Sequence, residues 1–252
     1  MDYPRASAYD QQWVLVNSMG PHPLWLLEAL TQVLPLRHGM RVLDLGCGRA
    51  LTSIFLAREF GVRVTAADLW IKPTDNWARI REAGCEDLVT PLHAEAHDLP
   101  FADGYFDAIV SVDAYHYFGT DDLYLAYLAR FLAPGGRLGI VVPGLVQELD
   151  DSAPPPHLAA HWQSEFFTFH SPAWWRRHWE RGGCVEVEVA DTVPDGWQDW
   201  LGWSEACVAA GVERCRVDVA LTQADQGRSL CMARAVARVN GCMGSSHAAR
   251  LQ

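Results

Sequence analysis

Two glycines and two aspartates have the types and the spacing of a site that binds a nucleoside. Gly46 and Gly48 permit positive φ, so that backbone N–H groups can approach a ligand with no Cβ in the way. Asp44, two residues before Gly46, is well placed to meet a cationic amino-acid group. Asp68 lies 24 residues after Asp44 and could accept both hydrogen bonds of a ribose diol. This pattern predicts a site for a nucleoside cofactor.

Predicted strands and a helix position these residues. Val42, Leu43 and Leu45 form a short apolar strand before the glycines, and residues 52–59 continue as a helix whose N-terminus points at the same spot. Residues 62–67 have the pattern of a second strand, which ends at Asp68. The chain therefore begins as an α/β nucleotide-binding fold.

Two classes of nucleotide cofactor compete for such a strand, turn and helix. A dinucleotide fingerprint has the pattern Gly-x-Gly-x-x-Gly, whose third glycine allows close helix packing. This chain has Leu51 at that place, and Asp44 would lie badly beside a pyrophosphate. A nicotinamide-dependent oxidoreductase is therefore the remote alternative.

The run Val42-Leu43-Asp44-Leu45-Gly46-Cys47-Gly48 resembles motif I of the class I S-adenosylmethionine-dependent methyltransferases. Residues 93–101 resemble the family's third motif, in which an acid and an alanine read the adenine edge. This alignment puts Glu95 and Ala96 at those two places. The usual acid is Asp, so Asp98 is the substitute candidate.

Two more motifs follow in the family's order. Residues 104–112 resemble its fourth strand with the Phe-Asp entry, and residues 132–142 resemble a helix end, a Pro-Gly-Gly turn and the fifth strand. Motifs in this order are far more specific than any one of them. The resemblance is strong over residues 41–142 and covers the remainder by architecture alone.

The resemblance implies an α/β, Rossmann-like class I methyltransferase fold. Its sheet would have seven mostly parallel strands with an antiparallel last strand, helices on both faces and an aromatic-rich lid. The implied cofactor is S-adenosyl-L-methionine. The residues expected to bind it are Asp44, Gly46, Cys47, Gly48, Asp68, Leu69, Trp70, Glu95, Ala96, Asp98, Ser111 and Val112.

Composition restricts the partners and the location. The chain has 252 residues, half of them hydrophobic, which suffices for a full core and most economically for one domain. A net charge of -11 without a basic stripe argues against nucleic acid. We expect a cytoplasmic protein without a membrane partner, because the apolar runs are too short to span a bilayer and no secretory signal is visible. The seven scattered cysteines contain no Cys-x-x-Cys pair, so no metal is expected.

We expect one domain over residues 1–252, with a helical cover at 1–40, a cofactor-binding core at 41–142, and a loose tail at 240–252. Lid or substrate insertions are expected at 143–170 and 192–226. An acidic, proline-rich link at 150–156 precedes an aromatic-rich second half, in which Ser171 and Pro172 predict the start of a helix with three tryptophans. These aromatics either fill the lid's core or roof a deep, apolar acceptor pocket.

Three residues after the fourth strand are the catalytic candidates. Methyl transfer from a sulfonium is an in-line displacement that needs alignment, exclusion of water and, for some acceptors, removal of a proton. His116 has a pKa suited to a neutral-pH base and falls at the carboxyl end of a parallel strand. Tyr115 and Tyr117 could orient the acceptor. Each of the three could instead simply pack.

The sequence predicts an S-adenosylmethionine-dependent methyltransferase that acts on a small metabolite or natural product, with the accepting atom (O, N, C or S) and the oligomeric state left open. One alternative is an enzyme of the same fold that uses the bound cofactor as a scaffold for another reaction, such as a cyclisation. A binding or regulatory protein is a further alternative with little support.

Overall fold

A seven-stranded sheet forms the centre of the computed structural model, which describes residues 2–149 and 153–240. The strand order is β3-β2-β1-β4-β5-β7-β6. The strands are β1 (Arg41–Leu45), β2 (Arg63–Asp68), β3 (Val89–His93), β4 (Phe106–Val112), β5 (Leu132–Leu145), β6 (Val185–Thr192) and β7 (Leu230–Val239). Strands β1 to β5 pair in parallel, whereas β7 is antiparallel to both β5 and β6. The predicted fold, with its antiparallel last strand, is confirmed.

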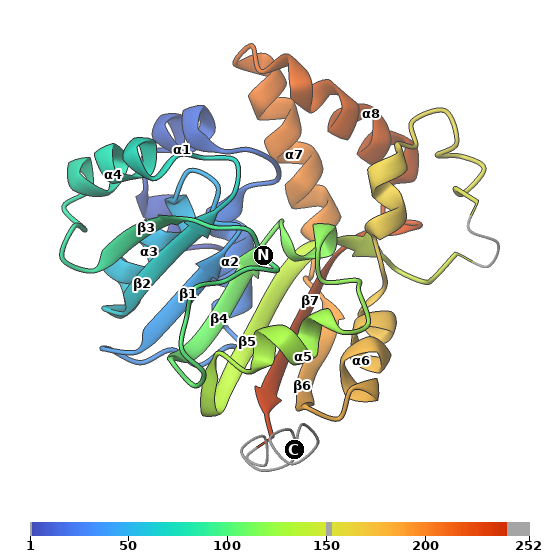
Figure 1. The fold of residues 1–252 in the computed structure, drawn as a ribbon. Helices are drawn as coiled ribbons and strands as arrows, with labels where there is room; N and C mark the ends of the chain where they lie inside the picture. Colours follow the sequence, from blue (N-terminus) through green and yellow to red (C-terminus); the bar gives the residue numbers. More distant parts are fainter. Residues whose placement is uncertain (1, 150–152, 241–252) are drawn as a thin grey trace.

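Helices cover both faces of this sheet (Figure 1). They are α1 (Gln11–Asn17), α2 (Pro23–Thr31), α3 (Leu51–Phe60), α4 (Pro73–Glu82), α5 (Tyr124–Ala129), α6 (Pro172–Arg181), α7 (Gly196–Ala209) and α8 (Arg216–Asp225). Short 3₁₀ turns are η1 (Ala6–Ala8), η2 (Tyr115–Tyr117), η3 (Ser164–Thr168) and η4 (Glu213–Cys215). Among the described residues, no helix is long and apolar enough to cross a membrane.

Side chains alternate between two cores because successive residues of a strand point to opposite faces. Val42 and Val110 pack in the core shared with α2 and α3, while their neighbours Leu43 and Ile109 pack in the core shared with α5 and α6. Both faces are therefore apolar, as a parallel sheet between two helical layers requires.

Helix α6 begins as the sequence predicts. The Ser171 hydroxyl accepts a hydrogen bond from the Trp174 N–H at 3.1 Å, and Pro172 occupies the first helical position. Trp175 and Trp179 of this helix are fully buried, whereas Trp174 is partly exposed.

The second half of the chain adds helices to the sheet without extending the parallel core. Helices α7 and α8 stand beyond one end of the sheet in Figure 1, and Trp200 and Trp203 of α7 are buried in the same core as α2. These tryptophans serve packing. Residues 150–152 of the predicted link and the predicted tail beyond Asn240 lie outside the described residues.

Asp225 connects α8, the start of β7 and the chain after the link. Its buried carboxylate accepts hydrogen bonds from the N–H groups of Ser229 (3.0 Å) and Leu230 (2.9 Å), and it lies 2.9 Å from His157 Nε2. We expect Asp225→Ala to lower the free energy of unfolding by about 2–4 kcal/mol, because buried donors lose a charged acceptor. Chemical denaturation measures this change.

The matched control for this prediction is Glu186→Ala. Glu186 accepts a hydrogen bond from the Arg238 guanidinium at 2.6 Å, but both groups are exposed. Its removal should change the free energy of unfolding by no more than about 0.5 kcal/mol. Equal losses for the two variants would contradict the connecting role of Asp225.

Candidate active site

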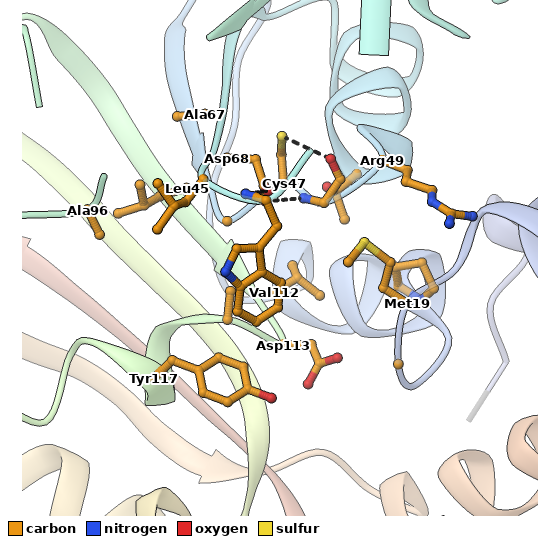
Figure 2. A pocket seen from close by; sticks show the side chains of 18 of the residues that line it. Met19, Leu45, Cys47, Arg49, Ala67, Asp68, Ala96, Val112, Asp113 and Tyr117 are labelled. Atoms are coloured by element: carbon orange, nitrogen blue, oxygen red, sulfur yellow. Dashed lines mark hydrogen bonds between the residues drawn. The ribbon is translucent and has the colours of Figure 1, made fainter. Parts of the chain in front are cut away.

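A cavity of about 350 Å³ lies at the carboxyl ends of β1, β2 and β4. Figure 2 shows side chains that line it. The chain segments around it are far apart in sequence: 17–21, 45–49, 67–70, 94–97 and 112–114, with Tyr117 and Phe118. Ligands bind at this edge of open α/β sheets, where the chain leaves adjacent strands in opposite directions.

The turn after β1 passes too close to its neighbours for a side chain at its first glycine. Gly46 has φ +75°, and a Cβ built there would lie 2.4 Å from the Ala114 Cβ. The N–H groups of Gly46 and Cys47 both donate to the Ala67 carbonyl, at 2.9 and 3.1 Å. The turn is therefore held between the ends of β2 and β4, with its backbone facing the cavity.

Asp68 at the end of β2 is fixed by backbone donors. One carboxylate oxygen accepts from the Gly48 N–H at 2.8 Å, and the other accepts from Trp70 and Ile71 at 2.8 and 2.9 Å. Asp68 lines the cavity and is 8% exposed. Because each carboxylate oxygen can accept more than one hydrogen bond, Asp68 keeps capacity for a ligand.

Asp44 lies behind the turn and does not line the cavity. Its Oδ2 accepts hydrogen bonds from the hydroxyls of Thr52 and Ser53, both at 2.6 Å, which ties β1 to the first turn of α3. Its buried Oδ1 has no partner in the described structure. Burial raises the pKa of Asp44 to about 6 against the opposing effect of the two hydroxyls.

The predicted adenine segment divides into residues at the cavity and residues away from it. Ala96, Leu69 and Trp70 line the cavity, and so does Glu95, whose carboxylate accepts from the N–H of His97 at 2.7 Å. Asp98 is exposed and is not among the lining residues. Of the two candidate acids for the adenine contact, Glu95 and Asp98, the geometry therefore favours Glu95.

The end of β4 contributes one wall. Val112 lines the cavity, whereas Ser111 is fully buried and donates to the Leu45 carbonyl at 2.8 Å. Ser111 thus joins β4 to β1, and Val112 is the one of the pair within reach of a ligand.

Two of the three catalytic candidates are buried away from the cavity. Tyr115 packs with its ring centroid 5.5 Å from Trp175 and 5.8 Å from Trp179. His116 is 1% exposed, its Nδ1 has no partner, and burial lowers its pKa to about 3. Neither residue lines the cavity, so the geometry does not favour either role.

Tyr117 does line the cavity and is 49% exposed. Its ring centroid lies 6.0 Å from that of Trp70, which is also exposed. Burial of its hydroxyl, with Asp113 as a nearby negative charge, raises the pKa of Tyr117 to about 12. As a neutral phenol it can donate a hydrogen bond to a ligand.

Asp113 is a lining residue that the sequence analysis did not single out. It follows β4 directly, and Figure 2 shows its carboxylate in the cavity. A Cβ at Gly20 would lie 2.1 Å from its Oδ2, so the N-terminal segment passes directly against it. An acid immediately after the apolar run of β4 is the signal that could have revealed it.

Comparison with known proteins gives a consistent family. Residues 42–136 match the methyltransferase domain family. The methyltransferase GfsG of Streptomyces halstedii is 35% identical over 129 residues, which cover 51% of this chain and 46% of that protein. The 27-O-demethylrifamycin SV methyltransferase of Amycolatopsis mediterranei is 34% identical over 116 residues, 46% of this chain and 43% of that protein. The chain thus matches about half the length of these relatives.

Solved structures share the fold. A putative sarcosine dimethylglycine methyltransferase from Galdieria sulphuraria superposes with a TM-score of 0.69 at 22% identity, covering 86% of this chain and 84% of the other. The [4+2]-cyclase SpnF superposes with a TM-score of 0.68 at 18% identity, covering 86% and 80%. With the matched family model, the motifs in order and this sheet, residues 42–136 form a methyltransferase domain with the class I, S-adenosylmethionine-dependent architecture.

Proposed function

We propose that the protein transfers a methyl group from S-adenosylmethionine to a small-molecule acceptor. The observation that carries this proposal is the cavity in which the glycine turn, Asp68 and residues 94–97 meet. The names of curated relatives support the acceptor class, because they include a fatty-acid O-methyltransferase and a demethylmenaquinone methyltransferase.

The cavity residues fit the cofactor's three parts. The side-chain-free backbone at Gly46 and Gly48 would receive the amino-acid part, and Asp68 has acceptor capacity left for the ribose hydroxyls. Leu69, Trp70 and Ala96 give an apolar edge for the adenine, with Glu95 as its polar neighbour. Bound S-adenosylmethionine supplies an electrophilic methyl group on a sulfonium.

Asp44 would act on the cofactor through the turn. Its unpartnered Oδ1 is a buried acceptor next to the glycine turn, and its other oxygen holds the first turn of α3. Because Asp44 does not line the cavity, we propose that it sets the shape and potential of the turn instead of meeting the amino-acid group directly.

The N-terminal segment would cover the cofactor and exclude water. Arg49 donates to the Val16 carbonyl at 2.8 Å, and Arg214 donates to the Ser18 carbonyl at 2.7 Å. The segment at 17–21 is thereby held over the cavity from both the turn and the second half of the chain. Tyr117 would orient the acceptor from the opposite wall.

The remaining expectations stay predictions. They are the single-domain division with its lid at 143–170 and 192–226, the base role of His116, the cytoplasmic location, and the absence of nucleic-acid and membrane partners. Scaffolding of a cyclisation has one point in its favour, the shared fold of the cyclase SpnF. Analysis of products for a transferred methyl label separates the two reactions.

Asp68→Ala should abolish cofactor binding. The substitution removes the acceptor for the ribose and releases the Gly48 N–H, so we expect affinity for S-adenosylmethionine and its demethylated product to fall at least 100-fold in calorimetric titration. The control is Asp103→Ala, which removes an exposed acid paired with Arg130 and should leave both affinities unchanged. Wild-type affinity in a folded Asp68→Ala protein would refute this site.

Gly46→Ala should abolish binding for a different reason. Its Cβ would lie 2.4 Å from Ala114, in addition to the cost of positive φ. Gly104→Ala is the matched control, since Gly104 has φ +68° and nothing within 4 Å of a built Cβ. We expect both variants to lose some stability and the Gly46 variant alone to lose cofactor affinity. Retained affinity in that variant would show that the turn does not contact the cofactor.

Asp44→Asn should change the pH dependence of stability. A carboxyl whose pKa rises from 3.8 unfolded to about 6 folded costs stability as pH increases through that window, because the unfolded state ionises first. Relative to wild type, the variant's free energy of unfolding should therefore improve by about 2 kcal/mol from pH 4.5 to pH 7. Chemical denaturation of both proteins at the two pH values measures it. An unchanged difference would show that Asp44 is not buried as a charge.

A further inference from the structure

Asp113 holds a backbone conformation that few side chains accept. Its φ is +53°, in the left-handed region, and its N–H donates to the Val141 carbonyl at 2.9 Å. Aspartate and asparagine tolerate this region better than most residues. Such strained positions gather at functional sites, where the surrounding structure maintains them. Here the conformation follows the last residue of β4 and sets a carboxylate in the cavity.

The carboxylate of Asp113 has no partner within the described chain. No described residue donates a hydrogen bond to it, and Gly20 packs so close that a Cβ built there would lie 2.1 Å from its Oδ2. Burial raises the pKa of Asp113 well above its usual range, and Asp218 of α8 adds negative charge. Because Asp113 lines the cavity and receives no hydrogen bond from the described chain, its carboxylate can accept one from a ligand.

The charged neighbours of this wall are mostly acidic. Tyr117 of η2 has Asp113, Glu165 of η3 and Asp218 of α8 as nearby negative charges. The arginine near Asp218 is Arg214, which is engaged with the Ser18 carbonyl. Asp113 therefore faces the acceptor side of the cavity without a counter-ion, where it can take up a proton.

Other titratable groups are less suited to meet the acceptor. His116 and Tyr115 do not line the cavity, and the acceptor capacity that Asp68 keeps beside its three backbone donors is assigned to the ribose. Tyr117 is a neutral phenol whose pKa burial raises to about 12, so it serves as a donor. Asp113 combines access to the cavity with free acceptor capacity.

We propose that Asp113 is a catalytic residue that accepts the proton of the acceptor's reacting O–H or N–H group, and that the acceptors are hydroxyl or N–H compounds. This inference rests on the proposed methyltransferase function. The acceptor's lone pair forms the bond to the methyl carbon while the carbon–sulfur bond breaks with its electrons left on sulfur. The O–H or N–H bond breaks, its electrons stay on the acceptor atom, and the proton goes to Asp113. Tyr117, whose ring centroid lies 6.0 Å from that of the adenine-side Trp70, would flank the acceptor's apolar body.

The test compares wild type with Asp113→Asn and Asp195→Asn. Asparagine keeps the volume and tolerates positive φ, so the first substitution removes the carboxylate and leaves the backbone as it is. Asp195 has the same backbone conformation, φ +56°, but is exposed and is not among the residues that line the cavity. Calorimetric titration with S-adenosylmethionine comes first. All three proteins should bind equally; a wild type that does not bind refutes the proposed function itself.

Transfer of a methyl label is then measured with two panels of acceptors. One carries phenol, aliphatic hydroxyl, and primary or secondary amine groups, and the other consists of thioethers, tertiary amines and alkenes. We expect transfer within the first panel, a rate at least 100-fold lower in Asp113→Asn, and an unchanged rate in Asp195→Asn. Transfer confined to the second panel, or an undiminished rate in Asp113→Asn, overturns the proposal.

An NMR titration of the Asp113 carboxyl needs no acceptor, so it tests the proposal even if neither panel reacts. Carboxyl ¹³C signals of labelled aspartate are titrated by NMR in wild type and Asp113→Asn. The signal missing from the variant should titrate clearly above the ordinary aspartate midpoint of about 4. An ordinary midpoint means a solvated carboxylate with no capacity to hold a proton at neutral pH, and it overturns the proposal.

Discussion

The close contact between Gly46 and Ala114 is the constraint on which the site depends. The turn after β1 is held by the Ala67 carbonyl at the end of β2 and presses against the segment after β4, with room for no side chain at Gly46. Three strand ends are thereby brought within one cavity. The same contact places Asp68 next to the turn and Asp113 one residue before Ala114, so the cofactor side and the acceptor side share a common wall.

The three aspartates at these strand ends lie in different environments, and each environment suits the carboxylate to a different role. Asp68 is satisfied by backbone N–H groups, Asp44 is buried against two hydroxyls, and Asp113 is left without a donor. Hydrogen bonds to a carboxylate favour its charged form, whereas burial without them favours the neutral form. Fixed geometry thus suits Asp68 to recognition, Asp44 to support of the turn, and Asp113 to proton uptake.

Local pattern sufficed to predict the strands and the turn, since apolar runs, glycines and strand-end acids are all features of a few adjacent residues. Local pattern did not show which of these residues face the cavity: Asp113, Tyr115, His116 or Tyr117. The reason is that the chain there leaves the strand through a left-handed residue and a 3₁₀ turn. One step of backbone rotation decides whether a side chain enters the cavity or the core. The burial of Tyr115 depends on Trp175 and Trp179, some 60 residues later, and no local pattern contains that contact.

Selectivity for the acceptor depends on contacts between segments that are distant in sequence. The cofactor side is built from the contiguous units β1 to β3 under the segment 17–21, whereas the acceptor side combines Asp113 and η2 with the neighbouring η3 and α8. The acidic charge that surrounds Asp113 comes from those later elements. Substitutions in α8 could therefore change the protonation of Asp113 without touching the cofactor site, so that one nucleoside-binding frame can serve acceptors of different acidity.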